Sequence, residues 1–191
     1  MPSILDKRRA GVLLHITSLP GDGAVGGLGQ EAYHFINFLH ETGITVWQTL
    51  PLVVTHSDRS PYQSLSAHAC NPDLIDISWV YRKGWLEYDD IDSNNSRVKS
   101  RQDLLAKAFD GFQAFADKKE KQTFETFCKE KSYWLDDYAL FMALREQFSQ
   151  QSWNHWPEEL KNRNQAALDH ASDLLKSQIA ATKFQQYLFY C

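Results

Sequence analysis

The sequence lacks a long apolar run and contains little cysteine. The longest apolar stretches fall within residues 11–14 and 46–54, far short of the ~20 residues that a transmembrane helix needs. Residues 1–10 carry charges with no signal-peptide h-region after them, so we expect no secretory signal peptide. The three cysteines lie far apart, which favours neither a disulfide framework nor a metal site. We therefore expect a cytoplasmic protein with no membrane partner.

Neither sign of charge dominates. Twenty basic and 24 acidic residues give a formal net charge of −4, and no basic stripe forms, so we expect no nucleic-acid partner. Hydrophobic residues make up 43% and charged residues 23%, which is typical of a folded globular protein. A chain of 191 residues has room for one ordinary domain.

Motifs for several common site types are missing. The seven histidines show no metal-ligand spacing, and no Gly-x-Ser-x-Gly motif supports serine-based hydrolysis. Asp136 and Asp137 are neighbours, so on a helix they point ~100° apart and we expect them on a solvated surface. For His15, which follows an apolar run, we favour a hydrogen-bonded structural role over a role in a site. We expect no catalytic residue of these types and no metal.

The first part of the chain predicts a strand–helix–strand unit. Residues 11–16 form a short apolar run, a helix of ~13 residues is expected from Gln30, and residues 44–50 form a second, β-branched run. Gly43 is placed to cap the helix at its C-terminal end. Two parallel strands joined by a helix form a right-handed βαβ unit, so the expected fold class is α/β.

The rest of the chain predicts a long loop followed by helices. Residues 53–76 are rich in Ser, Pro and His, and ordered loops of this length are more often functional than idle. From about residue 99 the pattern is helical, with one helix around 104–112, a second near 133–148 and a last one from about 164.

Two features indicate that the fold is incomplete within this sequence. Two strands cannot make a stable parallel sheet alone. Residues 183–191 are apolar and aromatic and end without a helix cap, whereas a chain terminus tends to be polar. We expect residues 1–80 to form the βαβ unit with its loop, and residues 81–191 to form a helical subdomain that is cut off at its end.

Residues 21–26 match the Gly-x-Gly-x-x-Gly pattern of dinucleotide-binding loops. Three details argue against that function: the match is separated from the strand by four residues, the helix begins several residues after it, and no acidic residue ends the second strand. We interpret these glycines as a loop that needs unusual dihedral angles. No nucleotide cofactor is expected, and nucleotide binding remains the weaker alternative.

The loop at residues 60–64 (SPYQS) is the strongest candidate site. Pro61 restricts the backbone, Tyr62 offers a ring face and a hydroxyl, and Ser60 and Gln63 offer hydrogen-bond donors and acceptors. Aromatic residues make up 13% of the chain; we expect most to fill cores, and some to be available to sugar rings, which bind aromatic walls with a few placed polar groups.

Several motifs together resemble the amylomaltases, the 4-α-glucanotransferases of glycoside hydrolase family 77. They are 9–21 (RAGVLLHITSLPG), 26–29 (GGLG), 47–52 (WQTLPL), 60–64 (SPYQS), Asn71 with Pro72, 138–144 (YALFMAL) and 153–157 (WNHWP). The resemblance extends from residue 9 to residue 191. It departs at Ile16, at Cys70 and at residues 55–59, and this last departure leaves open any sugar contact that the family makes there.

The resemblance implies a (β/α)8 barrel of which this chain holds strands 1 and 2, with a helical insertion. It also implies transfer of α-1,4-glucan segments between maltooligosaccharides, with retention and without a cofactor. The family's catalytic carboxylates lie on later strands, so the resemblance assigns no catalytic residue here. It implies that Ser60, Tyr62 and Gln63 contact the glucan and that Asn71 shapes the loop. The partners implied are maltooligosaccharides or other α-1,4-glucans and the remainder of the same polypeptide. A non-catalytic maltooligosaccharide-binding module or remnant is the alternative.

Overall fold

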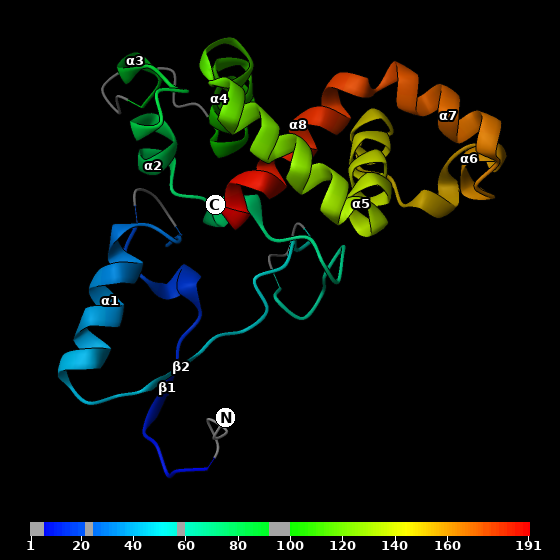
Figure 1. Cartoon of the computed structure of the whole chain (residues 1–191). Coiled ribbons are helices and arrows are strands. Elements are labelled where there is room, and N and C mark those ends of the chain that lie inside the picture. Colours follow the sequence, from blue (N-terminus) through cyan, green and yellow to red (C-terminus); the bar gives the residue numbers. More distant parts are fainter. Residues whose placement is uncertain (1–5, 22–24, 57–59, 92–99) are drawn as a thin grey trace.

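The computed structural model describes residues 6–21, 25–56, 60–91 and 100–191 (Figure 1). The predicted strand–helix–strand unit is confirmed. Strands β1 (Gly11–Leu13) and β2 (Val46–Gln48) pair in parallel with Gly11 opposite Val46, and helix α1 (Gln30–Glu41) connects them. The unit occupies one end of the molecule, and the helices that follow occupy the other.

Both strands are shorter than the predicted runs 11–16 and 44–50 because neighbouring caps limit them. The ring of His15 accepts a hydrogen bond from the Thr17 amide at 3.3 Å, which starts a short 3₁₀ turn, η1 (Ile16–Ser18). At the other strand, Gly43 has φ 75° and ends α1 as predicted. The Ile44 amide still donates to the Leu39 carbonyl of α1 at 2.9 Å, so the strand can begin only after it.

The glycine-rich segment differs from its prediction. Residues 22–24 of the Gly-x-Gly-x-x-Gly match lie outside the described residues, and none of the described glycines between 17 and 29 has a positive φ. A Cβ on Gly26 would lie 2.4 Å from the Leu19 carbonyl oxygen and 2.6 Å from that of Ile16. Close backbone packing, rather than an unusual dihedral angle, therefore requires glycine at this position.

The helical region begins earlier and is more divided than predicted. Its elements are η2 (Pro72–Leu74), α2 (Ile77–Arg82), α3 (Tyr88–Ile91), α4 (Arg101–Phe115), α5 (Lys118–Gln147), η3 (Trp153–His155), α6 (Glu158–Lys161), α7 (Gln165–Leu174) and α8 (Lys176–Tyr190). The sequence reading missed α2, α3 and the first half of α5. The single helix expected from about residue 164 is two helices, because Leu175 (φ −103°, ψ 21°) interrupts it.

Helix α8 lies in the middle of the helical part, packed against α5 and α4 (Figure 1). Its Phe184 is fully buried, and the ring centroid lies 4.8 Å from that of Phe112 on α4. Phe109 of α4 and Phe124 of α5 pack on the same ring, at 5.2 and 6.1 Å. Five of the 12 described buried residues in this main core are aromatic, in line with the expectation that most aromatic side chains fill cores. None of the described helices is both long and apolar enough to cross a bilayer.

Candidate functional site

The loop at 53–76 folds back on itself to form a short two-armed structure. Isolated antiparallel bridges join Val53 to Cys70 and Thr55 to Ser64. The Leu65 amide donates to the Val54 carbonyl at 2.9 Å between the same two arms. The segment from 60 to 63 lies beyond the outer bridge and forms the tip of this structure, so Ser60, Tyr62 and Gln63 lie at the tip and Asn71 lies at the base.

At the tip, the predicted residues share one turn. The Gln63 amide donates to the Ser60 carbonyl at 3.1 Å, which closes the turn around Pro61 and Tyr62. The Tyr62 side chain is 79% exposed and Gln63 is also exposed, whereas Ser60 is half-buried. The tip therefore offers a free aromatic face beside an amide and a hydroxyl. Of residues 55–59, where the resemblance departs, residues 57–59 lie outside the described residues.

The returning arm is shaped by polar side chains. Ser66 Oγ accepts hydrogen bonds from the His68 and Ala69 amides, both at 3.1 Å. Asn71 Oδ1 accepts from the Asp73 amide at 3.0 Å and caps η2. These side chains satisfy backbone donors that the irregular chain leaves unpaired. This capping contact is compatible with the predicted loop-shaping role of Asn71, which remains a prediction.

The base of the loop packs on the helical region. Val54 and Ala69 are buried against Trp134, Leu135 and Tyr138 of α5. Cys70 is held by α8, because its amide donates to Gln186 Oε1 at 2.9 Å and its carbonyl accepts from Gln186 Nε2 at 2.9 Å. The predicted site is therefore carried as much by the helical region as by the strands.

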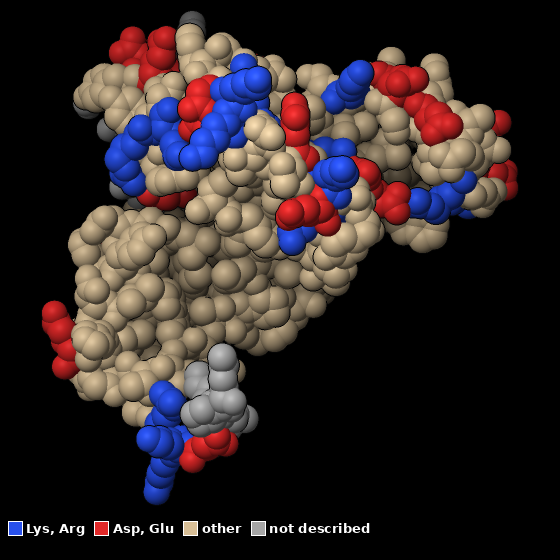
Figure 2. Space-filling model, in the orientation of Figure 1, with Lys and Arg blue, Asp and Glu red and all other residues tan. Residues whose placement is uncertain are grey.

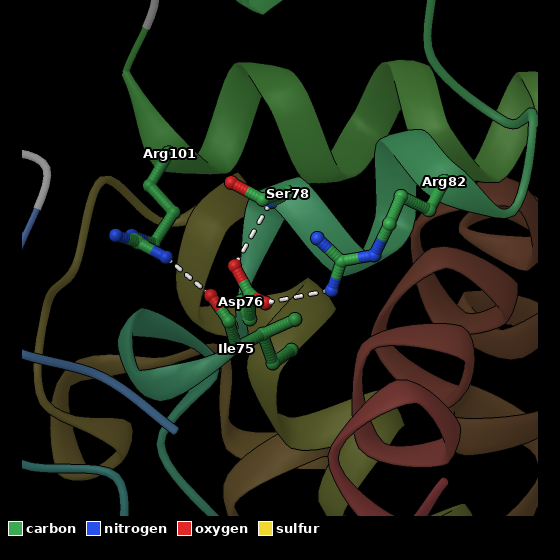
Figure 3. Close-up of polar contacts among 5 residues, drawn as sticks. All are labelled: Ile75, Asp76, Ser78, Arg82 and Arg101. Atoms are coloured by element: carbon green, nitrogen blue, oxygen red, sulfur yellow. Dashed lines mark hydrogen bonds and ion pairs between the residues drawn. The ribbon is translucent and has the colours of Figure 1, made fainter. Parts of the chain in front are cut away.

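A second group of polar contacts fixes the end of the loop (Figure 3). Asp76 caps α2 by accepting from the Ser78 amide at 3.0 Å, and its other oxygen lies 3.4 Å from the Arg82 guanidinium. Arg101, at the start of α4, donates to the Ile75 carbonyl. These contacts fasten the chain after η2 to both α2 and α4.

A pocket of about 720 Å³ lies beside the loop, at the carboxyl ends of the two strands. Parallel sheets and barrels place their ligands at this edge. Its lining residues include His15, Thr55, Pro61, Asn71, Asp73 and Arg101. Of the four predicted site residues only Asn71 lines it, while Ser60, Tyr62 and Gln63 do not. Asp73 is the one acidic residue among the described residues that line this pocket.

His15 and the carboxylate pair have the surroundings that the sequence indicated. His15 Nδ1 lies 2.7 Å from the Thr17 hydroxyl and accepts from the Thr17 amide, so the ring is hydrogen-bonded as expected. Its buried Nε2 has no partner among the described residues, and the structural role remains a prediction. Asp136 and Asp137 are exposed and pair with different cations, Lys183 and Arg163. The two carboxylates therefore do not face a common bond.

The thiols near the site are held in their neutral form. Burial raises the pKa of the Cys70 thiol, and a hydrogen bond with Tyr190 lowers it only in part. Burial likewise raises the pKa of Cys128, to about 11. A thiol is nucleophilic only as a thiolate, so neither cysteine is suited to covalent chemistry near neutral pH. Among the described residues, no group of three His, Cys, Asp or Glu side chains could hold a metal ion.

Sequence reasoning missed the residues that support the loop from a distance. Gln186 is a polar residue within the apolar run 183–191, and it is buried on α8 as are Phe184 and Tyr187. A buried-face glutamine is a recognisable signal, because such a group needs hydrogen-bond partners. Arg101 had no such signal, since its partner is a backbone carbonyl 26 residues away.

Charge is unevenly distributed on the face shown in Figure 2. Lys, Arg, Asp and Glu gather over the helical part and at the N-terminal segment. The surface between them, over the strand unit and the neighbouring loop, is almost free of charged side chains apart from one acidic group at its edge. This surface is better suited to a neutral, hydroxyl-rich ligand than to an ionic one.

The chain is similar in sequence to known proteins of one family. The family model described as 4-alpha-glucanotransferase, glycoside hydrolase family 77, matches residues 14–191. The chain is 41% identical over 189 residues to the 4-alpha-glucanotransferase of Thermus thermophilus, covering 96% of this chain and 38% of that protein. It is 37% identical over 188 residues to that of Clostridium butyricum, covering 93% of this chain and 38% of the relative.

A solved structure is similar over the same region. The amylomaltase from Streptococcus agalactiae in complex with acarbose matches with a TM-score of 0.87 and 36% sequence identity, covering 96% of this chain and 39% of that one. The chain thus spans under two fifths of the length of these relatives.

Proposed function

The chain belongs to the 4-alpha-glucanotransferases of glycoside hydrolase family 77, and on this premise we propose that it forms the N-terminal part of an enzyme that transfers α-1,4-glucan segments between maltooligosaccharides. In this proposal β1 and β2 are the first two strands of a (β/α)8 barrel. Residues 1–80 form its first unit and residues 81–191 a helical insertion, with α2 crossing the boundary. The remainder of the same polypeptide completes the barrel.

The catalytic carboxylates are assigned outside this chain. Transfer with retention needs a nucleophile and an acid/base whose carboxyl groups lie ~5 Å apart. The pocket at the strand ends has a single acidic residue, Asp73, among the described residues that line it. Residues 1–191 therefore supply the substrate side of the site rather than the reacting groups.

The observation that carries the proposal is the exposure of Tyr62 on a braced loop. Its ring is 79% exposed although the arms beneath it are hydrogen-bonded and packed on α5. An aromatic ring held in this way can stack on the apolar face of a pyranose, while Ser60 and Gln63 can hydrogen-bond its hydroxyl groups. On the face shown in Figure 2, the described surface over the strand unit has few charged side chains, which fits a neutral glucan.

Titration of the chain with maltoheptaose, followed by calorimetry, tests this proposal. We expect Tyr62→Ala to weaken binding about two- to tenfold, the equivalent of about 0.5–1.5 kcal/mol for one aromatic contact. Tyr62→Phe keeps the ring and should lose less. Tyr88→Ala, which removes a tyrosine of similar exposure from α3, is the matched control and should leave binding unchanged.

Two results would contradict the proposal. If maltoheptaose does not bind, or binds equally well to the Tyr62→Ala chain, the loop is not a glucan contact. If the chain alone disproportionates maltotriose, the reacting carboxylates lie within residues 1–191. Binding without any glucan transfer in a complete polypeptide would favour the alternative of a non-catalytic module.

A further inference from the structure

Gln186 is the one polar side chain that is buried among the described residues, with 1% of its surface exposed. It lies on α8 between side chains that fix this helix in the core, including the fully buried Phe184. Both ends of its amide group are used, and both bind the same residue, Cys70, at 2.9 Å. A buried amide costs free energy unless it is paired, so this pairing fixes the side chain in one orientation.

The backbone of Cys70 is available because of its place in the loop. Cys70 is bridged to Val53, but the hydrogen bonds of that bridge run from Asn71 to Leu52 and from Val54 to Ala69. In such an antiparallel pair the amide and carbonyl of the bridged residue point away from the partner arm. Gln186 fills the position that a third strand would occupy and satisfies both groups.

Resting on the proposed function, we propose that Gln186 is a positioning residue for the glucan site, acting through the Cys70 backbone to hold the returning arm of the loop that carries Tyr62. Cys70 directly precedes Asn71, which caps η2, and the same arm leads back through Ser64 to the tip. Helix α8 therefore belongs to the binding site although none of its residues lines the pocket beside the loop among those described.

The substitution Gln186→Glu tests the hydrogen bond to the Cys70 carbonyl while the hydrogen bond from the Cys70 amide can remain. An ionised carboxylate can still accept from the Cys70 amide but faces the Cys70 carbonyl with a second acceptor, whereas a protonated carboxyl group can donate to that carbonyl. We expect maltoheptaose to bind roughly tenfold more weakly at pH 8, which corresponds to about 1.4 kcal/mol. Burial at this position should raise the pKa of the carboxyl group above its ordinary value of about 4.3, so at pH 5 the group is protonated and the affinity should recover to that of the unaltered chain at the same pH.

Controls separate this effect from other titrations and from misfolding. Burial raises the pKa values of Cys70, Tyr138 and Tyr190, so these neighbours stay neutral from pH 5 to 8. The unaltered chain, measured at both pH values, corrects for any other effect of pH on binding. Gln178→Glu places the same charge on the exposed side of α8 and should have no effect.

Gln186→Met retains a similar shape without either hydrogen bond and serves if the glutamate variant does not fold at pH 8. It should weaken binding at both pH values and accelerate hydrogen exchange at the Cys70 amide at least tenfold. If the unaltered chain binds maltoheptaose but both Gln186 variants bind it equally well, the positioning role is wrong and the proposed function stands. If the unaltered chain does not bind, the proposed function fails and the positioning role with it.

Discussion

Replacing Gly111 by alanine should lower the stability of the protein, although helix propensity alone would predict an increase. The residue lies inside α4, where alanine is more favourable than glycine by ~1 kcal/mol in an exposed helix. A Cβ at this position would lie 2.2 Å from the Trp85 carbonyl oxygen and 2.8 Å from its carbonyl carbon. Because the obstacle is backbone, no rotation of a side chain can relieve the overlap.

The magnitude follows from these two opposing effects. Overpacking of this kind costs ~1–3 kcal/mol, and a backbone obstacle next to the buried Trp85 favours the upper end. After the gain in helix propensity, we expect Gly111→Ala to lower the free energy of unfolding by ~1–2 kcal/mol. For a chain of this size the melting temperature should fall by ~2–8 °C.

Urea unfolding followed by far-UV circular dichroism and tryptophan fluorescence measures this change. Gln113→Ala, on the exposed side of the same helix, is the matched control and should stay within ~0.5 kcal/mol of the unaltered chain. A Gly111→Ala chain that is more stable than the original would show that α4 does not approach Trp85 this closely, and the reasoning would be refuted.

Three further measurements test other parts of the structure. Ser100→Ala and Asp117→Ala each remove one side of a capping box, at α4 and α5, and each should cost ~1 kcal/mol in urea unfolding. Because burial raises the pKa of Cys128 to about 11, its alkylation should be slow at pH 8 and should accelerate about tenfold per pH unit up to that value. The folded state holds the Cys128 thiol proton more tightly than the unfolded state does. The contribution of Cys128 to stability is therefore complete below about pH 9 and is lost as the pH rises to about 11. A Cys128→Ala chain should show a shallower alkaline decline in the urea midpoint.

The strand unit could be predicted because its signals are local. The apolar run before the first loop, the amphipathic helix from Gln30 and the cap at Gly43 each depend on nearby residues, and the structure confirms all three elements. The strand ends were wrong by several residues because they depend on how the His15 ring and the Ile44 amide are bonded. A pattern of apolar residues does not contain that information.

The helical region shows where periodicity fails. The first half of α5 is rich in Lys and Glu and has too few apolar positions to mark a buried face, so only its later half could be predicted. The break at Leu175 was missed for the opposite reason, since apolar spacing continues across it and Leu175 is itself buried. Packing against other helices, rather than local preference, decides both cases.

The sequence predicted the loop that forms the candidate site, but it did not predict the contacts that hold this loop in place. The tip at Ser60, Tyr62 and Gln63 stands out by composition, whereas its supports, Gln186 and Arg101, act through backbone groups of residues distant in the sequence. Nearly every residue has the same backbone amide and carbonyl, so a sequence motif does not show which of them accept or donate a hydrogen bond to a distant side chain. The glucan contacts of the tip and the shaping role of Asn71 remain predictions.

The contact between Gln186 and Cys70 joins residues that are 116 positions apart, and this has a consequence for biosynthesis. At translation rates of about 5–20 residues per second, roughly 6–23 s separate the synthesis of Cys70 from that of Gln186. During this interval the nascent loop can form the local hydrogen bonds of Ser66 and Asn71 but not the two hydrogen bonds with Gln186 of α8. The loop proposed to contact the glucan is therefore fastened late in a growing chain, after most of the helical region has been made.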